Sequence, residues 1–286
     1  MTRPSPPPVP DSGGLSLPGA KVLVTGASTG IGRALALALA REGAVVAAVA
    51  RRMDLLDEVV EQCRATGSTD STWYAVDLSD PRAAERLALQ VWDELDGLDA
   101  IVHNAGMPMR KHALRLTGDE VEQVIAVNYI SPVRMTLALL PRMLERGHGS
   151  IVAVGSVAGR WGISRESAYS GSKFALTGFL ESLRVDLTGS PIDVRIVQPG
   201  PIDTPIWDQP GNEPGAYAGA KYPPEDVADA VLAALRPGRF ETFVPPGMAD
   251  VVAMKNADPD AFMAYLAASD AAGGGIAGGI GPSGGP

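Results

Sequence analysis

Tyr169 and Lys173 lie four residues apart within residues 167–187, a segment whose apolar side chains recur with helical spacing. On a helix, residues four apart lie one above the other on the same face. An ammonium group beside a phenol favours the phenolate, which allows the tyrosine to exchange a proton with a substrate oxygen near neutral pH. A free tyrosine pKa near 10 would have to fall by about three units, or roughly 4 kcal/mol, and a half-solvated lysine does not supply that alone.

A third polar group, Ser156, ends a predicted buried strand at residues 150–156 and precedes Tyr169 by thirteen positions. Open α/β sheets bind their ligands at the carboxyl ends of the strands, so the Ser156 hydroxyl could hydrogen-bond the reacting oxygen. A tyrosine and a lysine at this spacing are also common on surface helices that carry no chemistry. The catalytic interpretation therefore depends on a cofactor site elsewhere in the chain.

Residues 21–42, KVLVTGASTGIGRALALALARE, predict such a site because they combine a buried strand, a turn of small residues and a helix beginning near Ile31. Gly26, Gly30 and Gly32 allow a tight turn, close approach of backbone N–H groups to an anion, and tight packing of helix on strand. The positive end of the helix would face the pyrophosphate of a dinucleotide. The spacing is GxxxGxG rather than GxGxxG, so a strand-to-helix turn without a ligand stays an alternative.

The second predicted strand, residues 44–50, is followed by Arg51 and Arg52 and ends without a carboxylate. An acidic residue at this position accepts from the free 2′-hydroxyl of NAD, whereas arginine accommodates the 2′-phosphate of NADP. We therefore predict NADP, with Arg51 as the main selector and Arg52 in support. Two solvated arginines at a strand end are the alternative. Asp54 comes later and is expected to cap the next helix.

Asp77 and Leu78 end the third predicted strand, residues 72–78. The Asp77 carboxylate could accept a hydrogen bond from the adenine amino group. It could equally cap the helix that follows Pro81, and the sequence favours neither interpretation.

The fourth predicted strand, residues 98–102, runs into His103, Asn104, Ala105 and Gly106. The small residues would let the backbone lie against the cofactor, and the Asn104 amide can tie neighbouring strands together. His103 has no partner at metal-ligand spacing, and no metal site is expected.

Residues 118–146 predict a long helical region with a capping pattern at Thr117 or Asp119. Asn128 lies within this region, and an amide facing inward there needs a hydrogen-bond partner. Two prolines are expected to interrupt the helix: Pro132 and Pro141.

Alternating strands and helices predict one α/β domain over residues 17–270. It should be a single doubly wound, Rossmann-type domain with a seven-stranded, mostly parallel sheet and helices on both faces. The other expected strands are residues 193–198 and 241–244, and the other expected helices are residues 55–65, 83–95, 225–235 and 259–268.

Residues 205–224 carry five prolines together with Trp207, Tyr217 and Tyr222. This composition predicts a long irregular loop that acts as a substrate lid, with a surface loop free of ligand contact as the alternative. Two further segments have too few large apolar side chains to recover the entropy of folding and are expected to be disordered. They are the Pro-rich residues 1–16 and the Gly-rich residues 271–286.

A formal net charge of −9 argues against nucleic-acid binding, which rests on clustered lysine and arginine. The single cysteine, Cys63, excludes an internal disulfide and a cysteine-based metal cage. No uninterrupted apolar run approaches the roughly eighteen residues needed to cross a bilayer. These features favour a soluble, cytoplasmic protein without a membrane or nucleic-acid partner.

Taken together, the motifs of residues 17–246 resemble the short-chain dehydrogenase/reductase family. TGASTGIG at residues 25–32 is similar to the family's cofactor loop, and NAG at residues 104–106 to its fourth-strand motif. YSGSK at residues 169–173 resembles its YxxxK motif. The other similar features are Ser156, the helix residue Asn128, and PGPIDTP at residues 199–205, which resembles the loop over the nicotinamide.

The resemblance implies that Tyr169 is the general acid/base and that Lys173 binds the nicotinamide ribose and depresses the tyrosine pKa. Ser156 would hold the substrate oxygen, and Asn128 would hold a water in a proton relay. A positively charged nicotinamide beside the pair would supply the rest of the shift in pKa. Ser28 and Thr29 of the glycine loop are not basic, so the choice of NADP rests mainly on Arg51.

The function expected from these features is hydride transfer between NADP(H) and a carbonyl or secondary alcohol of a small, rather apolar substrate. An NAD-dependent alcohol dehydrogenase and a non-catalytic cofactor sensor are the alternatives, and a homodimer or homotetramer is expected from the resemblance. The residues expected at the cofactor are Gly26, Ser28, Thr29, Gly30, Ile31, Gly32, Arg51, Arg52, Asp77, Leu78, Asn104, Ala105, Gly106, Tyr169, Lys173, Pro199, Gly200, Ile202 and Thr204.

Overall fold

The structure, a computed structural model, describes residues 14–215, 217 and 219–271. The predicted tails therefore lie outside the described residues, except at their inner ends. The backbone N–H of Leu15 donates to the carbonyl oxygen of Leu235 at 3.0 Å, so the folded part begins before the predicted boundary at residue 17. At the other end, the last helix continues to Ala271, one residue into the predicted tail.

Seven strands form one sheet in the order β3-β2-β1-β4-β5-β6-β7, and every neighbouring pair is parallel. This topology confirms the predicted doubly wound α/β fold. Strand order reverses between β1 and β4, which is where open α/β sheets form their ligand crevice. The strands are β1 (Lys21–Thr25), β2 (Val45–Ala50), β3 (Thr72–Ala75), β4 (Ala100–His103), β5 (Gly149–Val154), β6 (Ile192–Pro199) and β7 (Glu241–Val244).

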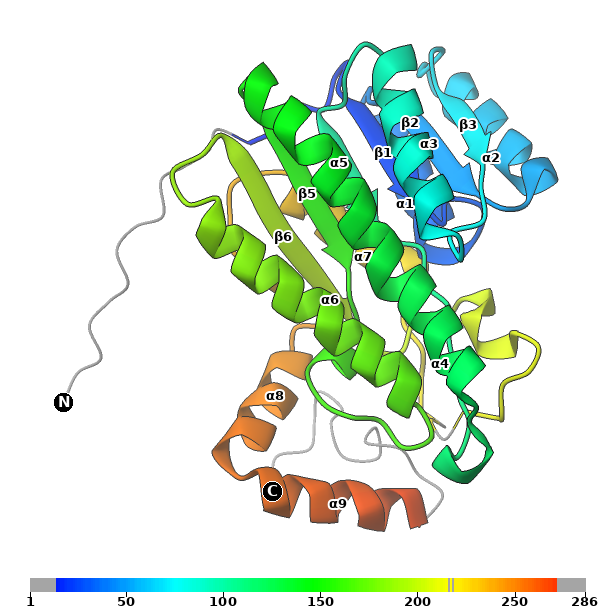
Figure 1. Ribbon diagram of the computed structural model, residues 1–286, viewed down its shortest axis with the longest axis vertical. Coiled ribbons are helices and arrows are strands. Elements are labelled where there is room, and N and C mark those ends of the chain that lie inside the picture. The colour runs from blue at the N-terminus through cyan, green and yellow to red at the C-terminus, as the bar shows by residue number, and fades with distance from the viewer. Residues whose placement is uncertain (1–13, 216, 218, 272–286) are drawn as a thin grey trace.

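Helices cover both faces of the sheet (Figure 1). The side chains of successive strand residues point to opposite faces, so Val22 and Val24 of β1 pack in one buried cluster and Leu23 in the other. One face carries α1 (Gly30–Arg41), α2 (Met53–Ala65) and α7 (Pro224–Ala234). The other carries α3 (Pro81–Glu94), α5 (Ser131–Arg146) and α6 (Ser167–Asp186).

Two helices, α3 and α4 (Gly118–Ile125), begin with side-chain caps, and one of these caps is not the expected residue. Thr117 caps α4: its hydroxyl accepts from the Glu120 N–H, and the Glu120 carboxylate accepts from the Thr117 N–H. Asp80, not Asp77, caps α3 by accepting from the N–H groups of Arg82 and Ala83. The proposed capping role of Asp54 is also wrong, because it lies inside the first turn of α2.

Residues 118–146 form one continuous helical stretch, so the expected interruption at the two prolines is wrong. Pro132 lies in the first turn of α5, where its ring is tolerated, and Pro141 lies inside α5. The carbonyl that loses its helical partner at Pro141 belongs to Leu137, an exposed residue that water can reach. The irregular part is instead a single π-turn at Ala126–Ile130, which contains Asn128.

By length and composition this 29-residue helix could cross a membrane, since the mean hydropathy of an 18-residue window within it reaches 1.4. The sequence analysis expected no membrane-spanning segment because no uninterrupted apolar run is long enough. Core helices pass the same test, and Leu139 and Met143 of α5 are fully buried against the sheet. The apolar composition of the helix is therefore explained at least in part by the core.

Two helices lie below the carboxyl ends of β5 and β6 in Figure 1: α8 (Met248–Ala257) and α9 (Pro259–Ala271). The sequence predicted α9 but not α8. Val251 of α8 and Phe262 of α9 pack with Val157 and Trp161, which follow β5. The two helices thus close the sheet edge on the side where Ser156 lies.

Removing the capping box of α4 should lower stability without altering the cavity. Thr117→Ala leaves the Glu120 N–H without its acceptor, and we expect the free energy of unfolding to fall by about 1 kcal/mol. Denaturant unfolding measures the loss. Thr117→Ser keeps the hydroxyl and should retain most of the stability; equal losses in both variants would contradict the capping role.

Candidate active site

A cavity of about 890 Å³ opens at the carboxyl edge of the sheet. Its wall contains every residue that the sequence predicted at the cofactor, together with Ser156. These residues come from the segments that follow β1, β2, β3, β4, β5 and β6, and from α6. Asn128 alone among the predicted site residues does not line the cavity, because it lies behind the wall and is 1% exposed.

The glycine loop between β1 and α1 admits no larger side chain at two positions. A Cβ atom on Gly32 would lie 2.2 Å from the carbonyl oxygen of Gly26, and one on Gly26 would lie 2.8 Å from the Cα of Ala105. Gly26 and Gly30 also have positive φ angles of 69° and 54°, which favour glycine.

The start of α1 suits an anionic ligand. The residue at its N-cap, Thr29, makes no capping hydrogen bond with its side chain, and the first turn contains no acidic residue. The N–H groups of this turn line the cavity with the positive end of the helix dipole behind them. The loop and the helix end together fit the pyrophosphate of a dinucleotide.

Asn104 ties β4 to β1, as the sequence predicted. Its Nδ2 donates to the carbonyl oxygens of Thr25 and Gly26 at 2.9 and 3.3 Å. In return, the Thr25 hydroxyl accepts from the N–H groups of Asn104 and Ala105. These bonds hold the loop after β4 against the glycine loop, so the two segments form one wall.

The two arginines after β2 differ in their contacts. Arg52 crosses the glycine loop, where its Nη2 donates to the hydroxyls of Thr29 at 3.2 Å and Ser28 at 3.5 Å. Arg51 is exposed on the cavity wall and makes no side-chain hydrogen bond or ion pair with any residue that the structure describes. The Arg51 guanidinium is therefore available to bind a ligand.

Asp77 also lines the cavity, and its Oδ1 accepts from the Ser79 N–H at 2.9 Å. Of its two proposed roles, the cap of α3 is wrong because Asp80 occupies that position. The contact with adenine stays a prediction.

Tyr169 and Lys173 lie on one face of α6, beside the end of β5. The Lys173 Nζ is 5.9 Å from the centroid of the Tyr169 ring and donates to the carbonyl oxygen of Val154 at 3.0 Å. Lys173 is buried, and burial lowers its pKa to about 8. The ammonium group is thus held by the sheet, close to the phenol.

In the protein by itself the Tyr169 pKa is raised well above its usual range. The predicted lowering includes the charge of a bound nicotinamide and stays a prediction. Burial is the largest cause, and the nearby Glu166 carboxylate adds to it. A hydrogen bond with Ser156 and the charge of Arg110 act in the opposite direction but are weaker. In the protein by itself, desolvation therefore outweighs the groups that lower the pKa of this phenol.

Asn128 holds two segments together from the π-turn. Its Oδ1 accepts from the Met107 N–H at 2.7 Å, and its Nδ2 donates to the Met107 carbonyl at 2.9 Å and to the Ser172 hydroxyl at 3.0 Å. Ser172 in turn donates to the Tyr169 carbonyl at 2.6 Å. Both amide N–H groups are used by protein atoms, and the role of this residue in a proton relay stays a prediction.

Sequence reasoning missed the residue that positions Ser156. Gln198 of β6 is fully buried; its Oε1 accepts from the Ser156 N–H at 2.8 Å, and its Nε2 donates to the Glu241 carboxylate at 2.9 Å. A Cβ on Gly155 would lie 2.2 Å from that Oε1, so the glycine makes room for the contact. A glutamine inside an otherwise apolar strand was the available signal.

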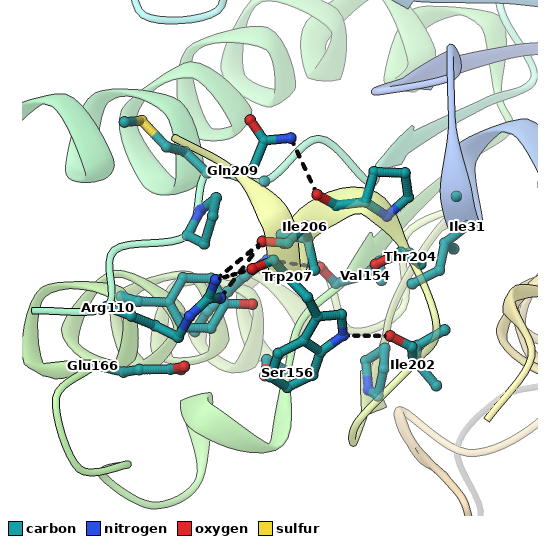
Figure 2. A pocket seen from close by; sticks show the side chains of 18 of the residues that line it. Ile31, Arg110, Val154, Ser156, Glu166, Ile202, Thr204, Ile206, Trp207 and Gln209 are labelled. Carbon is teal, nitrogen blue, oxygen red and sulfur yellow. Dashed lines mark hydrogen bonds between the residues drawn. The ribbon is translucent and has the colours of Figure 1, made fainter. Parts of the chain in front are cut away.

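Arg110 was also missed, and it joins the predicted lid to the wall of the cavity (Figure 2). Its buried guanidinium donates to the carbonyl oxygens of Ile206, Trp207 and Glu213, and lies 5.4 Å from the Trp207 ring centroid. The lid has little regular structure beyond a short 3-10 turn at Pro205–Asp208. Residues of the loop line the cavity, and its contact with a substrate stays a prediction.

Comparison with known proteins agrees with this architecture. The sequence profile of the family described as short chain dehydrogenase matches residues 20–214. The chain belongs to this family. It is 32% identical over 230 residues to the uncharacterized oxidoreductase YxnA of Bacillus subtilis, an alignment that covers 78% of the chain but only 64% of that relative.

Solved structures of the family have the same fold. A short chain dehydrogenase/reductase from Burkholderia phymatum in complex with NAD superposes with a TM-score of 0.77, covering 86% of this chain and 96% of that one at 23% identity. An alcohol dehydrogenase from Thermococcus sibiricus complexed with 5-hydroxy-NADP gives a TM-score of 0.68 at 26% identity, covering 78% and 95%. At 23% identity the first of these similarities concerns the fold alone.

The burial of Lys173 predicts a pH dependence of stability. Its pKa falls from 10.5 to about 8 on folding, so the unfolded chain binds more protons than the folded chain between these values. The contribution of this residue to stability therefore rises with pH across this window and is lost as the pH falls through 8.

Lys173→Met removes that contribution. As the pH rises from about 8 to 10.5, we expect the free energy of unfolding of the parent to increase relative to that of the variant by up to about 3 kcal/mol. Cys63 and Tyr74, whose pKa values are raised mainly by burial, are common to both proteins and cancel. Denaturant unfolding at several pH values measures the difference, and parallel stability curves would contradict the prediction.

Proposed function

We propose that the protein is an NADP(H)-dependent oxidoreductase that transfers hydride between its cofactor and a carbonyl or secondary alcohol of a small molecule. The observation that carries this proposal is the arrangement of Ser156, Tyr169 and Lys173 on one wall of the cavity that the glycine loop also lines. The family and the oxidoreductase names of its relatives support the same activity.

The nicotinamide ring, when bound, supplies or accepts the hydride. The chain would bind the dinucleotide through the glycine loop and the N–H groups at the start of α1. Lys173, fixed by the Val154 carbonyl, would donate to the hydroxyls of the nicotinamide ribose. Ile202 and Thr204 line the cavity beyond β6, where they would contact the nicotinamide amide and the phosphates.

Tyr169 would exchange the proton that accompanies hydride transfer. In reduction its hydroxyl donates a proton to the substrate oxygen, and in oxidation the phenolate accepts one. Ser156, which interacts with the Tyr169 hydroxyl, would hydrogen-bond the same oxygen. The raised pKa of Tyr169 keeps the phenol protonated, which is the form that reduction requires.

The preference for NADP rests on Arg51. β2 ends without a carboxylate that could bind a free 2′-hydroxyl, and the Arg51 guanidinium is available on the cavity wall. Similar folds occur with NAD and with an NADP derivative, so the fold itself does not select the cofactor. An NAD-dependent alcohol dehydrogenase is therefore the second candidate, and a non-catalytic cofactor sensor the third.

A lid at residues 205–224 would enclose a substrate that is rather apolar. Around Ser156 and Tyr169 the cavity wall includes Met107, Ile163 and Leu266. The chemistry expected there is that of a small-molecule carbonyl or alcohol, with no nucleic acid or membrane as partner.

A homodimer or homotetramer would bury apolar side chains that the single chain exposes. Leu137 and Leu144 of α5 and Phe174 and Val185 of α6 are among the exposed large hydrophobic residues. A subunit contact through these two long helices would cover all four side chains. A cytoplasmic location completes the proposal.

Tyr169→Phe tests the mechanism. Loss of the hydroxyl removes the proton donor, so kcat with a responsive carbonyl substrate should fall by about 10² to 10⁴-fold. The phenyl ring keeps the packing, and the dissociation constant for NADPH should change little. Activity is followed by the absorbance of the reduced cofactor, and a variant with full activity would refute the assigned role.

Arg51→Ala tests the cofactor preference. Loss of a charged hydrogen bond to the 2′-phosphate should weaken NADPH binding by about tenfold or more, while NADH binding stays nearly constant. Calorimetric titration of both cofactors measures the change. An Arg51→Ala protein that binds both as the parent does, or a parent that prefers NADH, would favour the NAD-dependent alternative.

A further inference from the structure

Glu166 is a charged residue of the cavity wall that the proposed mechanism does not use. It immediately precedes α6, three residues before Tyr169, and its side chain is half-buried (Figure 2). Within residues 14–215, 217 and 219–271, no hydrogen bond or ion pair reaches its carboxylate. A carboxylate this close to the proposed proton donor, and without a protein partner, is suited to a ligand.

Two other charged groups of the cavity wall are already bonded to the protein. The Arg110 guanidinium donates to carbonyl oxygens of the lid, including that of Trp207. Asp270 of α9 accepts from the Ser164 hydroxyl at 2.9 Å. Arg165, beside Glu166, is exposed at the edge of the cavity. Unlike Arg110 and Asp270, the Glu166 side chain has no hydrogen-bond partner among the residues that the structure describes.

Burial of this carboxyl has an electrostatic cost that a ligand could offset. Desolvation raises the pKa of Glu166 to about 7, although the positive charge of Arg110 acts to lower it. The same carboxylate raises the pKa of Tyr169, three residues further along the chain. Partial desolvation of a carboxylate without a protein donor costs free energy, and a donor supplied by a bound molecule would offset that cost.

We propose that Glu166 is a substrate-binding residue that accepts a hydrogen bond from an O–H or N–H group lying close to the reacting carbon of the substrate. The inference rests on the proposed function, because it takes the oxygen held by Ser156 and Tyr169 as the reacting one. The substrate class it assigns comprises ketones with a neighbouring hydroxyl or amino group, and the alcohols that they form on reduction.

The rest of the cavity wall defines the remainder of this substrate. Met107, Ile163 and Leu266 are apolar residues of the same cavity wall, and Ile163 and Leu266 belong to one apolar cluster. The substrate would therefore be amphiphilic, with its donor group at Glu166 and its hydrocarbon part against these residues. This conclusion refines the expectation of a rather apolar substrate.

The test compares three matched ketones: an unsubstituted ketone, its hydroxy analogue and its amino analogue. We expect the parent enzyme to favour at least one donor-bearing ketone over the plain ketone by about tenfold to a hundredfold in kcat/KM, as a charged hydrogen bond allows. Glu166→Leu should abolish this preference. Because the ratio compares substrates within one protein, a change in the Tyr169 pKa alone leaves it unaltered.

Asp270→Asn is the matched control. Asp270 is another carboxylate on the cavity wall, but its oxygen is already bonded to Ser164. This variant should keep the preference of the parent. A gain with the hydroxy ketone alone identifies a hydroxyl donor, and a gain with the amino ketone alone identifies an ammonium. Equal rates for all three ketones in the parent, or a preference that survives in Glu166→Leu, would overturn the proposal.

A binding measurement separates this inference from the proposed function. In the Tyr169→Phe background, saturated with NADPH, calorimetry gives the dissociation constants of the same three ketones without turnover. The donor-bearing ketone should bind about tenfold or more tightly than the plain ketone, and adding Glu166→Leu should make the affinities equal. Failure of turnover in the parent would count against the oxidoreductase proposal. Equal affinities for the three ketones in Tyr169→Phe itself would count against the proposed role of Glu166.

Discussion

The hydrogen bond from the Lys173 ammonium to the Val154 carbonyl joins the two elements on which the site depends. It crosses from α6 to the end of β5, and both groups are buried. Removing an ammonium from water is costly unless its hydrogen bonds are made in the protein, so α6 must pack in a fixed register on the sheet. That register places Tyr169 one turn before the lysine and across from Ser156, which follows the same strand.

A chain of partly buried polar contacts supports the other side of this arrangement. Ser156 donates its N–H to Gln198, Gln198 donates to Glu241, and Arg160 pairs with both Glu241 and Glu181. The contacts connect the segment after β5 and α6 with β6 and β7. The buried amide of Gln198 is satisfied within this chain, so the position of Ser156 depends on several elements of the sheet edge.

The sequence predicted the seven strands, the glycine loop and the Asn104 contact because each depends on local patterns. Buried parallel strands appear as short runs of valine, alanine and isoleucine, and Gly26 and Gly32 occupy positions where a Cβ would meet backbone atoms. Other predictions failed where two interpretations were locally equivalent. Asp77 and Asp80 are both acidic residues near Pro81, and only the backbone geometry assigns the cap to Asp80. The raised pKa of Tyr169 in the protein by itself was not apparent from the sequence, because desolvation depends on the packing of the entire cavity wall.

The two halves of the cavity differ in how the chain encodes them. The proposed cofactor half is built largely from backbone groups, glycines and a helix end, whose requirements appear as short motifs such as TGASTGIG. The proposed substrate half is built from side chains on segments far apart in the sequence: Arg110 after β4, Glu166 before α6, the lid, and α9. No local spacing links these residues, which meet only when α6, the lid and the C-terminal helices pack against the sheet edge. A fold of this kind can therefore keep one cofactor chemistry while the side chains that contact the substrate change. The Glu166 carboxylate connects the two halves electrostatically, because its charge raises the pKa of Tyr169.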